Sequence, residues 1–127
     1  MRPTLRRIAT IELPVADLDR AVAWYESVLG LEVSYKGPRS AMLKLREAGN
    51  PSVYLVRTDA PERLQFKSTD DESTHSVIDF YCANLRAFYE ALAERDVALS
   101  ELEPGARGFA FKDPDGNLLG VTDLVLG

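Results

Sequence analysis

Two carboxylates and the only histidine of the chain are the side chains best suited to chemistry. Glu12 lies in a run of alternating polar and apolar residues, and His75 and Asp79 lie in a second run of the same kind. Because side chains alternate along a strand, His75 and Asp79 are expected on one face and Glu12 on the polar face of its own strand. A carboxylate in an apolar cleft can act as a general base, and the same residue types can also ligate a divalent metal ion.

Each of these side chains also has a purely structural interpretation. Glu12 can pair with Lys44 or Lys112, and Asp79 with Arg107, so that the carboxylates only satisfy buried charge. The histidine stands at the expected start of its strand, where such a residue is usually solvated. The pattern of residues leaves the catalytic, metal-binding and structural interpretations open.

The elements that must position these residues occur twice in the chain. Residues 10–33 and 77–99 repeat one pattern, a strand followed by an amphipathic helix, and Asp17 and Asn84 are the expected helix N-caps. The apolar helix positions Leu18, Ala21, Val22 and Tyr25 recur 67 residues later as Leu85, Phe88, Tyr89 and Leu92.

The two copies predict an α+β fold built from two tandem βαβββ modules. The modules should form a cupped mixed β-sheet with the helices on its outer face. The first module covers 1–58, a linker covers 59–74 and the second module covers 75–127. Strands are expected at 8–15, 31–35, 41–46, 53–57, 75–82, 97–101, 108–112 and 118–124, and helices at 18–29 and 85–95.

Composition limits the classes of function. The net charge of −5 disfavours a nucleic-acid partner, because phosphate contacts need a basic face. Cys82 is the only cysteine, so no disulfide can form within the chain, which is compatible with a cytoplasmic location. Neither a signal peptide nor an apolar segment long enough to cross a membrane is expected.

Three phrases in this order resemble the vicinal oxygen chelate superfamily. They are V-A-D-L at 15–18, A-V-A-W-Y-E-S-V-L-G at 21–30 and D-P-D-G-N at 113–117. That superfamily includes glyoxalase I, extradiol dioxygenases, fosfomycin-resistance enzymes and bleomycin-resistance proteins. The resemblance spans nearly the whole chain and implies the duplicated βαβββ fold. It does not by itself imply one activity, because the superfamily hosts several.

The resemblance also implies where a metal ion would be bound in metal-dependent members. Those positions correspond to Thr10 and Tyr54 in the first module, or Val53 if the register slips by one, and to Val77 and Gly120 in the second. Valine and glycine offer no side-chain donor, so we expect no metal and no other cofactor at these positions. A displaced site formed by His75 with Glu12 and Asp79 remains an alternative.

Strand alternation predicts which residues line the concave face of the sheet. The lining mixes apolar and aromatic surface with a few charges, as small-molecule sites do. Its carboxylates would attract a cationic or hydrogen-bond-donating ligand. The expected lining residues are Thr10, Glu12, Met42, Lys44, Tyr54, Val77, Asp79, Tyr81, Lys112 and Thr122.

Three functional hypotheses follow. The first is a metal-free binding protein of the bleomycin-resistance type, which sequesters or carries a small organic ligand in the cleft of a homodimer. The second is an enzyme (lyase, isomerase or dioxygenase) that uses the displaced metal site or acid–base chemistry by Glu12, His75 or Asp79. The third is a structural or regulatory module in which the cleft no longer functions.

Overall fold

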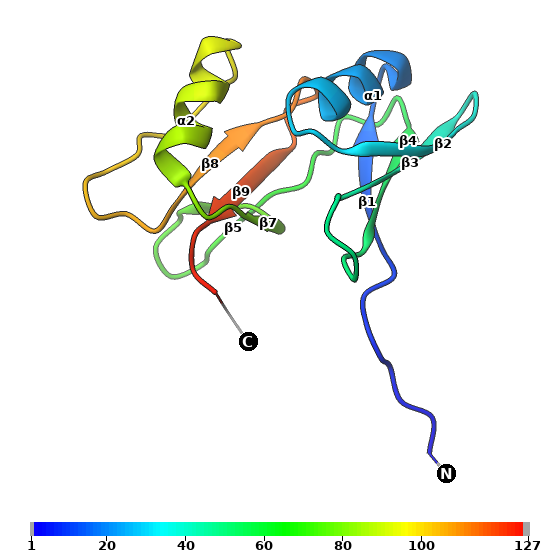
Figure 1. The fold of residues 1–127 in the computed structure, drawn as a ribbon, viewed down its shortest axis with the longest axis horizontal. Coiled ribbons are helices and arrows are strands. Elements are labelled where there is room, and N and C mark those ends of the chain that lie inside the picture. Colours follow the sequence, from blue (N-terminus) through cyan, green and yellow to red (C-terminus); the bar gives the residue numbers. More distant parts are fainter. Residues whose placement is uncertain (1, 126–127) are drawn as a thin grey trace. The chain divides into compact units, whose positions relative to one another are not determined.

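The computed structural model describes residues 2–125, and these form two compact units. The first unit extends to Ala60, and the second begins at Pro61. Residues 59–74, the linker expected from the sequence, thus lie mostly in the second unit. Each unit has its own sheet and its own helix (Figure 1).

The first unit contains a four-stranded mixed sheet with one helix. Its strand order is β1-β4-β3-β2, with β1 parallel to β4 and the other neighbours antiparallel. The helix packs along one side of this sheet (Figure 1). The elements are β1 (Thr10–Val15), α1 (Leu18–Ser27), β2 (Glu32–Lys36), β3 (Ser40–Lys44) and β4 (Ser52–Arg57).

Alternation of apolar residues explains which face of this sheet is buried. Leu13 and Val15 on β1 are fully buried, and so are every second residue of β3 and β4. The Asp17 carboxylate accepts a hydrogen bond from the backbone N–H of Arg20 at 3.1 Å, as expected of an N-cap. The helix then turns its apolar side, including the fully buried Tyr25, to the sheet. The opposite face of the sheet is left open.

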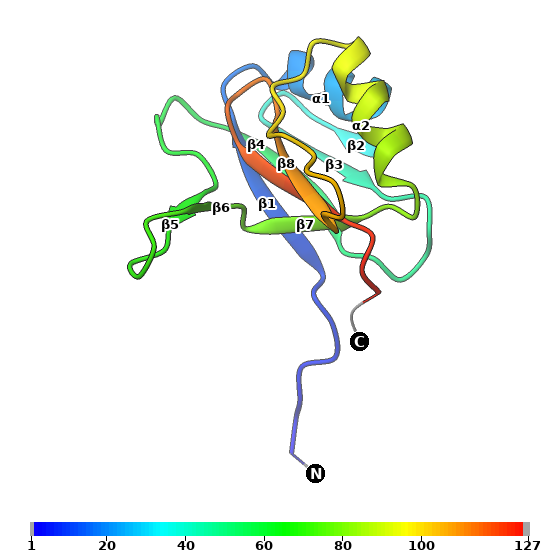
Figure 2. The same cartoon turned by 90° about the vertical axis from the view of Figure 1, so that its left-hand side faces the viewer.

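The second unit repeats this order with fewer regular strands. Its main sheet has the order β7-β9-β8, with β7 parallel to β9 and β8 antiparallel to it. A separate two-stranded hairpin precedes it, and Figure 2 shows β6 of that hairpin leading into β7. The elements are β5 (Phe66–Lys67), β6 (Thr74–His75), β7 (Ile78–Tyr81), α2 (Leu85–Glu94), β8 (Gly108–Lys112) and β9 (Leu118–Thr122).

Two strands expected in the second half differ from the prediction. The strand expected at 75–82 is divided into β6 and β7, because β6 pairs with β5 while β7 pairs with β9 from Ile78 on. The strand expected at 97–101 is reduced to one bridge between Leu99 and Phe111. Pro104 and Gly105 follow soon after this bridge, and Gly105 has a positive φ of 80°, so the chain turns away.

The turn between β8 and β9 is held by buried polar side chains. Asp113 and Asn117 are 4% and 0% exposed. The Asp113 carboxylate accepts hydrogen bonds from the backbone N–H of Asp115 and from the backbone and side-chain amides of Asn117. The Asn117 side-chain oxygen accepts a bond from the backbone N–H of Leu64 at 3.0 Å. This network ties residues near 64 to the sheet of the second unit.

The mixed α+β architecture of the prediction is confirmed, with curved mixed sheets and two helices. The helices are shorter than predicted by one or two residues at their carboxyl ends. Among residues 2–125 no helix is long and apolar enough to cross a bilayer.

Candidate functional site on the open sheet faces

The open face of the first sheet carries a row of three side chains from neighbouring strands. Glu12 on β1 lies opposite Tyr54 on β4, and Tyr54 lies opposite Met42 on β3. Glu12 is exposed, while the other two side chains are half-buried. Sequence reasoning placed these three residues on one face, and the register brings them together.

The open face of the second sheet carries the corresponding row with much smaller side chains. Asp79 on β7 lies opposite Gly120 on β9, and Gly120 lies opposite Ala110 on β8. Asp79 occupies the same place in its unit as Glu12 does in the first. Both rows thus begin with an acid, but the second row continues with glycine and alanine instead of tyrosine and methionine.

Asp79 leans over the glycine beside it. A Cβ atom added at Gly120 would collide with the Asp79 carboxylate and would lie 2.7 Å from the hydroxyl oxygen of Ser76. The Ser76 hydroxyl donates a hydrogen bond to that same carboxylate at 2.8 Å. The second unit therefore has a carboxylate where a side chain at position 120 would otherwise project. The partner expected for Asp79 was wrong, since Arg107 pairs with Asp123 at 2.6 Å.

A hollow of about 340 Å³ lies at the other end of this row, over β8 and the residues that flank the Leu99 bridge. Lys112, which was expected on the cleft face, contributes to it together with Ala110. Its volume is near the lower end for small-molecule sites, which run from roughly 300 to 1,000 Å³. The full lining is Ala98, Leu99, Ser100, Ala110, Phe111, Lys112 and Leu118.

The lysines at the ends of the corresponding strands have different surroundings. Lys44 ends β3 and lies opposite Glu32, whose carboxylate is 3.8 Å from its ammonium. This pair corrects the expectation that Lys44 pairs with Glu12. Lys112 ends β8, and its backbone N–H donates to the carbonyl of Ala98 at 3.0 Å. Within residues 2–125, neither Lys112 nor Glu12 forms an ion pair.

His75 does not share a strand with Asp79, which corrects the expected common face. It lies on β6, where its ring stacks on Phe66 with centroids 5.2 Å apart. Its Nε2 is 3.0 Å from the Ser73 hydroxyl, which donates to the Asp71 carboxylate at 2.7 Å. The hydrogen bond from the Ser73 hydroxyl and a second one from the Ser73 backbone N–H lower the pKa of Asp71 below its ordinary value. The histidine therefore belongs to an exposed loop cluster, and its partners are not those of Asp79.

The remaining expected lining residues lie at the edges of the two open faces. The Thr122 hydroxyl is already engaged, because it donates to the carbonyl of Arg107 at 2.8 Å. Thr10, Val77 and Tyr81 are exposed, and Val77 lies in the bend between β6 and β7.

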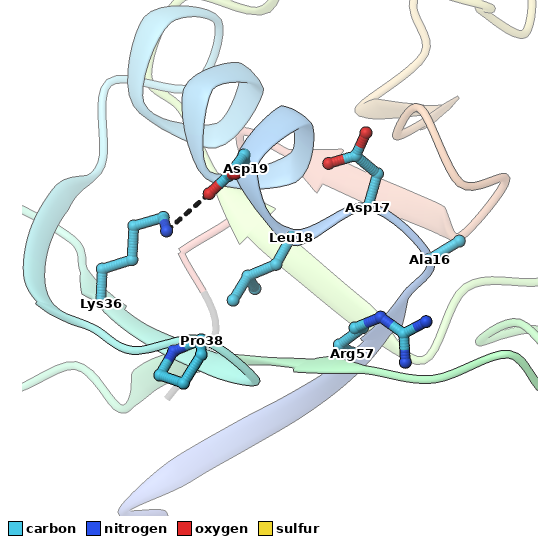
Figure 3. Close-up of a pocket in the computed structure, with 7 residues that line it drawn as sticks. All are labelled: Ala16, Asp17, Leu18, Asp19, Lys36, Pro38 and Arg57. Atoms are coloured by element: carbon cyan, nitrogen blue, oxygen red, sulfur yellow. Dashed lines mark ion pairs between the residues drawn. The ribbon is translucent and has the colours of Figure 1, made fainter.

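A second hollow, of about 410 Å³, opens at the start of α1 (Figure 3). Its charged side chains already have partners. Lys36 pairs with Asp19 at 2.5 Å, and Arg57 pairs with Asp59 at 3.1 Å. Asp17, which also lines it, caps the helix. The charges of this hollow are thus largely neutralised locally. It is lined by Ala16, Asp17, Leu18, Asp19, Lys36, Pro38 and Arg57.

The side chains at the positions implied for a metal ion do not fit a divalent cation. Val77 and Gly120 carry no donor atom, and the hydroxyls of Thr10 and Tyr54 do not belong to the usual ligand sets. Asp79, the nearest oxygen donor to Gly120, is held by Ser76. Within the part of each unit that the structure describes, no group of three or more His, Cys, Asp or Glu residues is placed to hold a metal.

Comparison with known proteins identifies the family. The family model described as Glyoxalase/Bleomycin resistance protein/Dioxygenase superfamily matches residues 7–121. The chain therefore belongs to this superfamily, as its sequence phrases indicated. No curated protein matches the sequence significantly.

Solved structures share the fold at low sequence identity. TnmS3, an antibiotic-binding protein from Streptomyces sp. CB03234, is 21% identical with a TM-score of 0.70, over 95% of this chain and 98% of that one. Lactoylglutathione lyase from Agrobacterium tumefaciens is 20% identical with a TM-score of 0.67, over 96% and 95%. The fosfomycin resistance protein FosX from Listeria monocytogenes is 18% identical with a TM-score of 0.68, over 99% and 94%.

Sequence reasoning missed several residues of the candidate site. Ala98 and Ser100 line the hollow, and the alternation of 97–101 would have placed them on the same face as Ala110. Ser76 was missed because nothing in its neighbourhood identifies it as a hydrogen-bond donor to Asp79. That contact depends on the bend between β6 and β7, which strand alternation does not predict.

Proposed function

We propose that this chain is a small-molecule-binding protein of the bleomycin-resistance type, which sequesters or carries a small organic ligand without a metal ion. The observation that carries the proposal is that Val77 and Gly120 offer no side-chain donor for a metal ion, while the Asp79 carboxylate beside Gly120 is bonded to the Ser76 hydroxyl. A hollow suited to a small ligand lies on the same face. TnmS3, described as an antibiotic-binding protein, supports this assignment by its similar fold.

We further propose that the protein works as a homodimer in the cytoplasm. The family resemblance supports a dimer, because related binding proteins form their clefts from two chains. The single cysteine is in keeping with a reducing compartment. Sedimentation equilibrium of the purified protein tests the dimer, and a strictly monomeric chain would contradict it.

A thermal-shift titration tests the metal-free proposal. The EDTA-stripped protein is titrated with manganese, iron(II), nickel and zinc. A ligand that binds only the folded state raises its Tm by mass action. We expect no saturable shift with any of these ions. A large saturable shift that is lost in His75→Ala would overturn the proposal and favour a displaced metal site.

An enzyme is the second candidate, and the exposure of Glu12 favours it. This carboxylate lies on the open face beside Tyr54 and has no ion-pair or hydrogen-bond partner among residues 2–125. A free carboxylate of this kind can accept a proton from a bound substrate. Loss of turnover of a candidate substrate in Glu12→Gln, with the fold intact, would favour the enzyme.

A further inference from the structure

We infer that the hollow on the second unit binds small aromatic molecules that carry an acidic group, with Lys112 as the counter-ion of that group. This inference rests on the proposed small-molecule function and specifies the class of ligand. The hollow would thus be positively charged, whereas the carboxylates of Glu12 and Asp79 led us to expect a negatively charged cleft that attracts cations.

The donors and acceptors of the lining define the charge of the ligand. Ser100 and Lys112 are the only two of the seven lining residues with a polar side chain. Lysine donates hydrogen bonds and accepts none. The Ser100 hydroxyl oxygen accepts a bond from the backbone N–H of Ala110 at 2.9 Å, which leaves its own proton available for donation. The lining thus offers two hydrogen-bond donors, Ser100 and Lys112, and no carboxylate. It should therefore prefer a ligand that accepts hydrogen bonds and carries negative charge.

The comparison of the two units explains why Lys112 is available. The first unit places Glu32 across from Lys44, so that strand-end lysine has a carboxylate next to it. In the second unit the bridge between Leu99 and Phe111 places Ala98 across from Lys112. The alanine removes the counter-ion and also the volume of its side chain. The same replacement therefore frees a positive charge and opens space beside it.

The shape of the hollow favours a flat apolar body. Because the side chains of Ala98 and Ala110 are small, they leave a depression between Leu118 and the edge of the sheet. A hollow of about 340 Å³ accommodates a body of one or two aromatic rings. Asp79 lies further along the same face, over Gly120, and its carboxylate is bonded to Ser76. The acidic end of a ligand is therefore expected at Lys112, away from Asp79.

Three isosteric probes test this inference on the full-length protein. Naphthalene-2-carboxylate, naphthalene-2-carboxamide and naphthalene-2-carboxamidinium have nearly the same shape and differ in charge. Their Kd values are measured by NMR titration at fixed low ionic strength. Because exposed ion pairs contribute up to about 1 kcal/mol, we expect the carboxylate to bind about three- to fivefold more tightly than the amide. The amidinium should bind most weakly.

Substitutions locate the charge that makes this difference. In Lys112→Met the carboxylate and the amide should bind with equal affinity, whereas Lys67→Met, the same change at an exposed lysine of β5, should keep the preference. Ala98→Glu installs in the second unit the carboxylate that Glu32 supplies in the first, and it should reverse the preference in favour of the amidinium. Ala98 is exposed, so this variant is expected to fold.

The outcomes separate this inference from the proposed function. Equal binding of all three probes, unchanged in Lys112→Met, overturns the role of Lys112 and leaves a binding protein without charge selection. If none of the three probes binds, the hollow is not the ligand-binding site. A metal-dependent Tm shift contradicts the metal-free proposal whatever the probes do.

Discussion

The Asp79 carboxylate lies in the space that a side chain at Gly120 would occupy. The two residues are cross-strand neighbours on β7 and β9, and the Ser76 hydroxyl holds the carboxylate in place at 2.8 Å. The Asp79 carboxylate thus fills the space that a larger residue at position 120 would need. The relationship matters for function because position 120 is where metal-dependent relatives are expected to carry a ligand.

A double-mutant cycle measures the coupling free energy between positions 79 and 120. Alanine in place of glycine within a strand normally stabilises a protein by roughly 0.5–1 kcal/mol. Here we expect Gly120→Ala to destabilise the protein by about 1 kcal/mol, because its Cβ displaces the Asp79 carboxylate from Ser76. In the Asp79→Ala background the same change should be neutral or stabilising. Urea unfolding of the four proteins gives the coupling, and equal effects in both backgrounds would show that there is none.

The buried polar turn between β8 and β9 should be a major determinant of stability. Asn117→Ala removes an amide that bonds to Asp113 and to the backbone N–H of Leu64. The change removes one bond to the buried Asp113 carboxylate and one to the part-buried N–H of Leu64, so we expect a loss of about 2–4 kcal/mol in the free energy of unfolding. Asn50→Ala, an exposed asparagine bonded to the carbonyl of Glu47, is the control and should cost less than about 1 kcal/mol. Similar losses in both variants would argue against a special role for this turn.

The loop cluster of Asp71 and Ser73 should stabilise the fold at neutral pH and lose this contribution at acid pH. The pKa of Asp71 is lowered in the folded protein, chiefly by the Ser73 hydroxyl. A carboxyl with a depressed pKa stabilises the fold above its unfolded pKa of about 3.9, and this contribution is lost as the pH falls through the lower folded value. In Ser73→Ala we expect the pKa of Asp71 to move up toward its ordinary value. An NMR titration of the carboxyl carbon measures this, and an unchanged value would assign the shift to another group.

The two helix caps offer a test of the internal repeat. Asp17 accepts a bond from the backbone N–H of Arg20, and Asn84 accepts one from that of Ala87, both at 3.1 Å. Loss of either cap by substitution with alanine should cost about 1 kcal/mol. Urea unfolding of Asp17→Ala and Asn84→Ala checks this. An effect in one variant and none in the other would show that the two caps are not energetically equivalent.

The sequence by itself determined the duplicated architecture and the polarity of each face. Strand alternation and helix spacing are local properties, so the register of Glu12 with Tyr54 and of Asp79 with Gly120 agrees with the faces predicted for them. The D-P-D-G-N phrase likewise defined the turn before β9. The missing donors at Val77 and Gly120 could also be read directly from residue types.

Only the tertiary structure decided which polar groups meet. Lys44 pairs with Glu32 and Arg107 with Asp123, because strand pairing brings together residues that are distant in sequence. The position of His75 depends on a change of strand partner between β6 and β7, which no periodicity records. The freedom of Lys112 likewise follows from the alanine across from it in the folded sheet. Pairwise contacts are set by packing, and a one-dimensional pattern fixes only the face on which a residue lies.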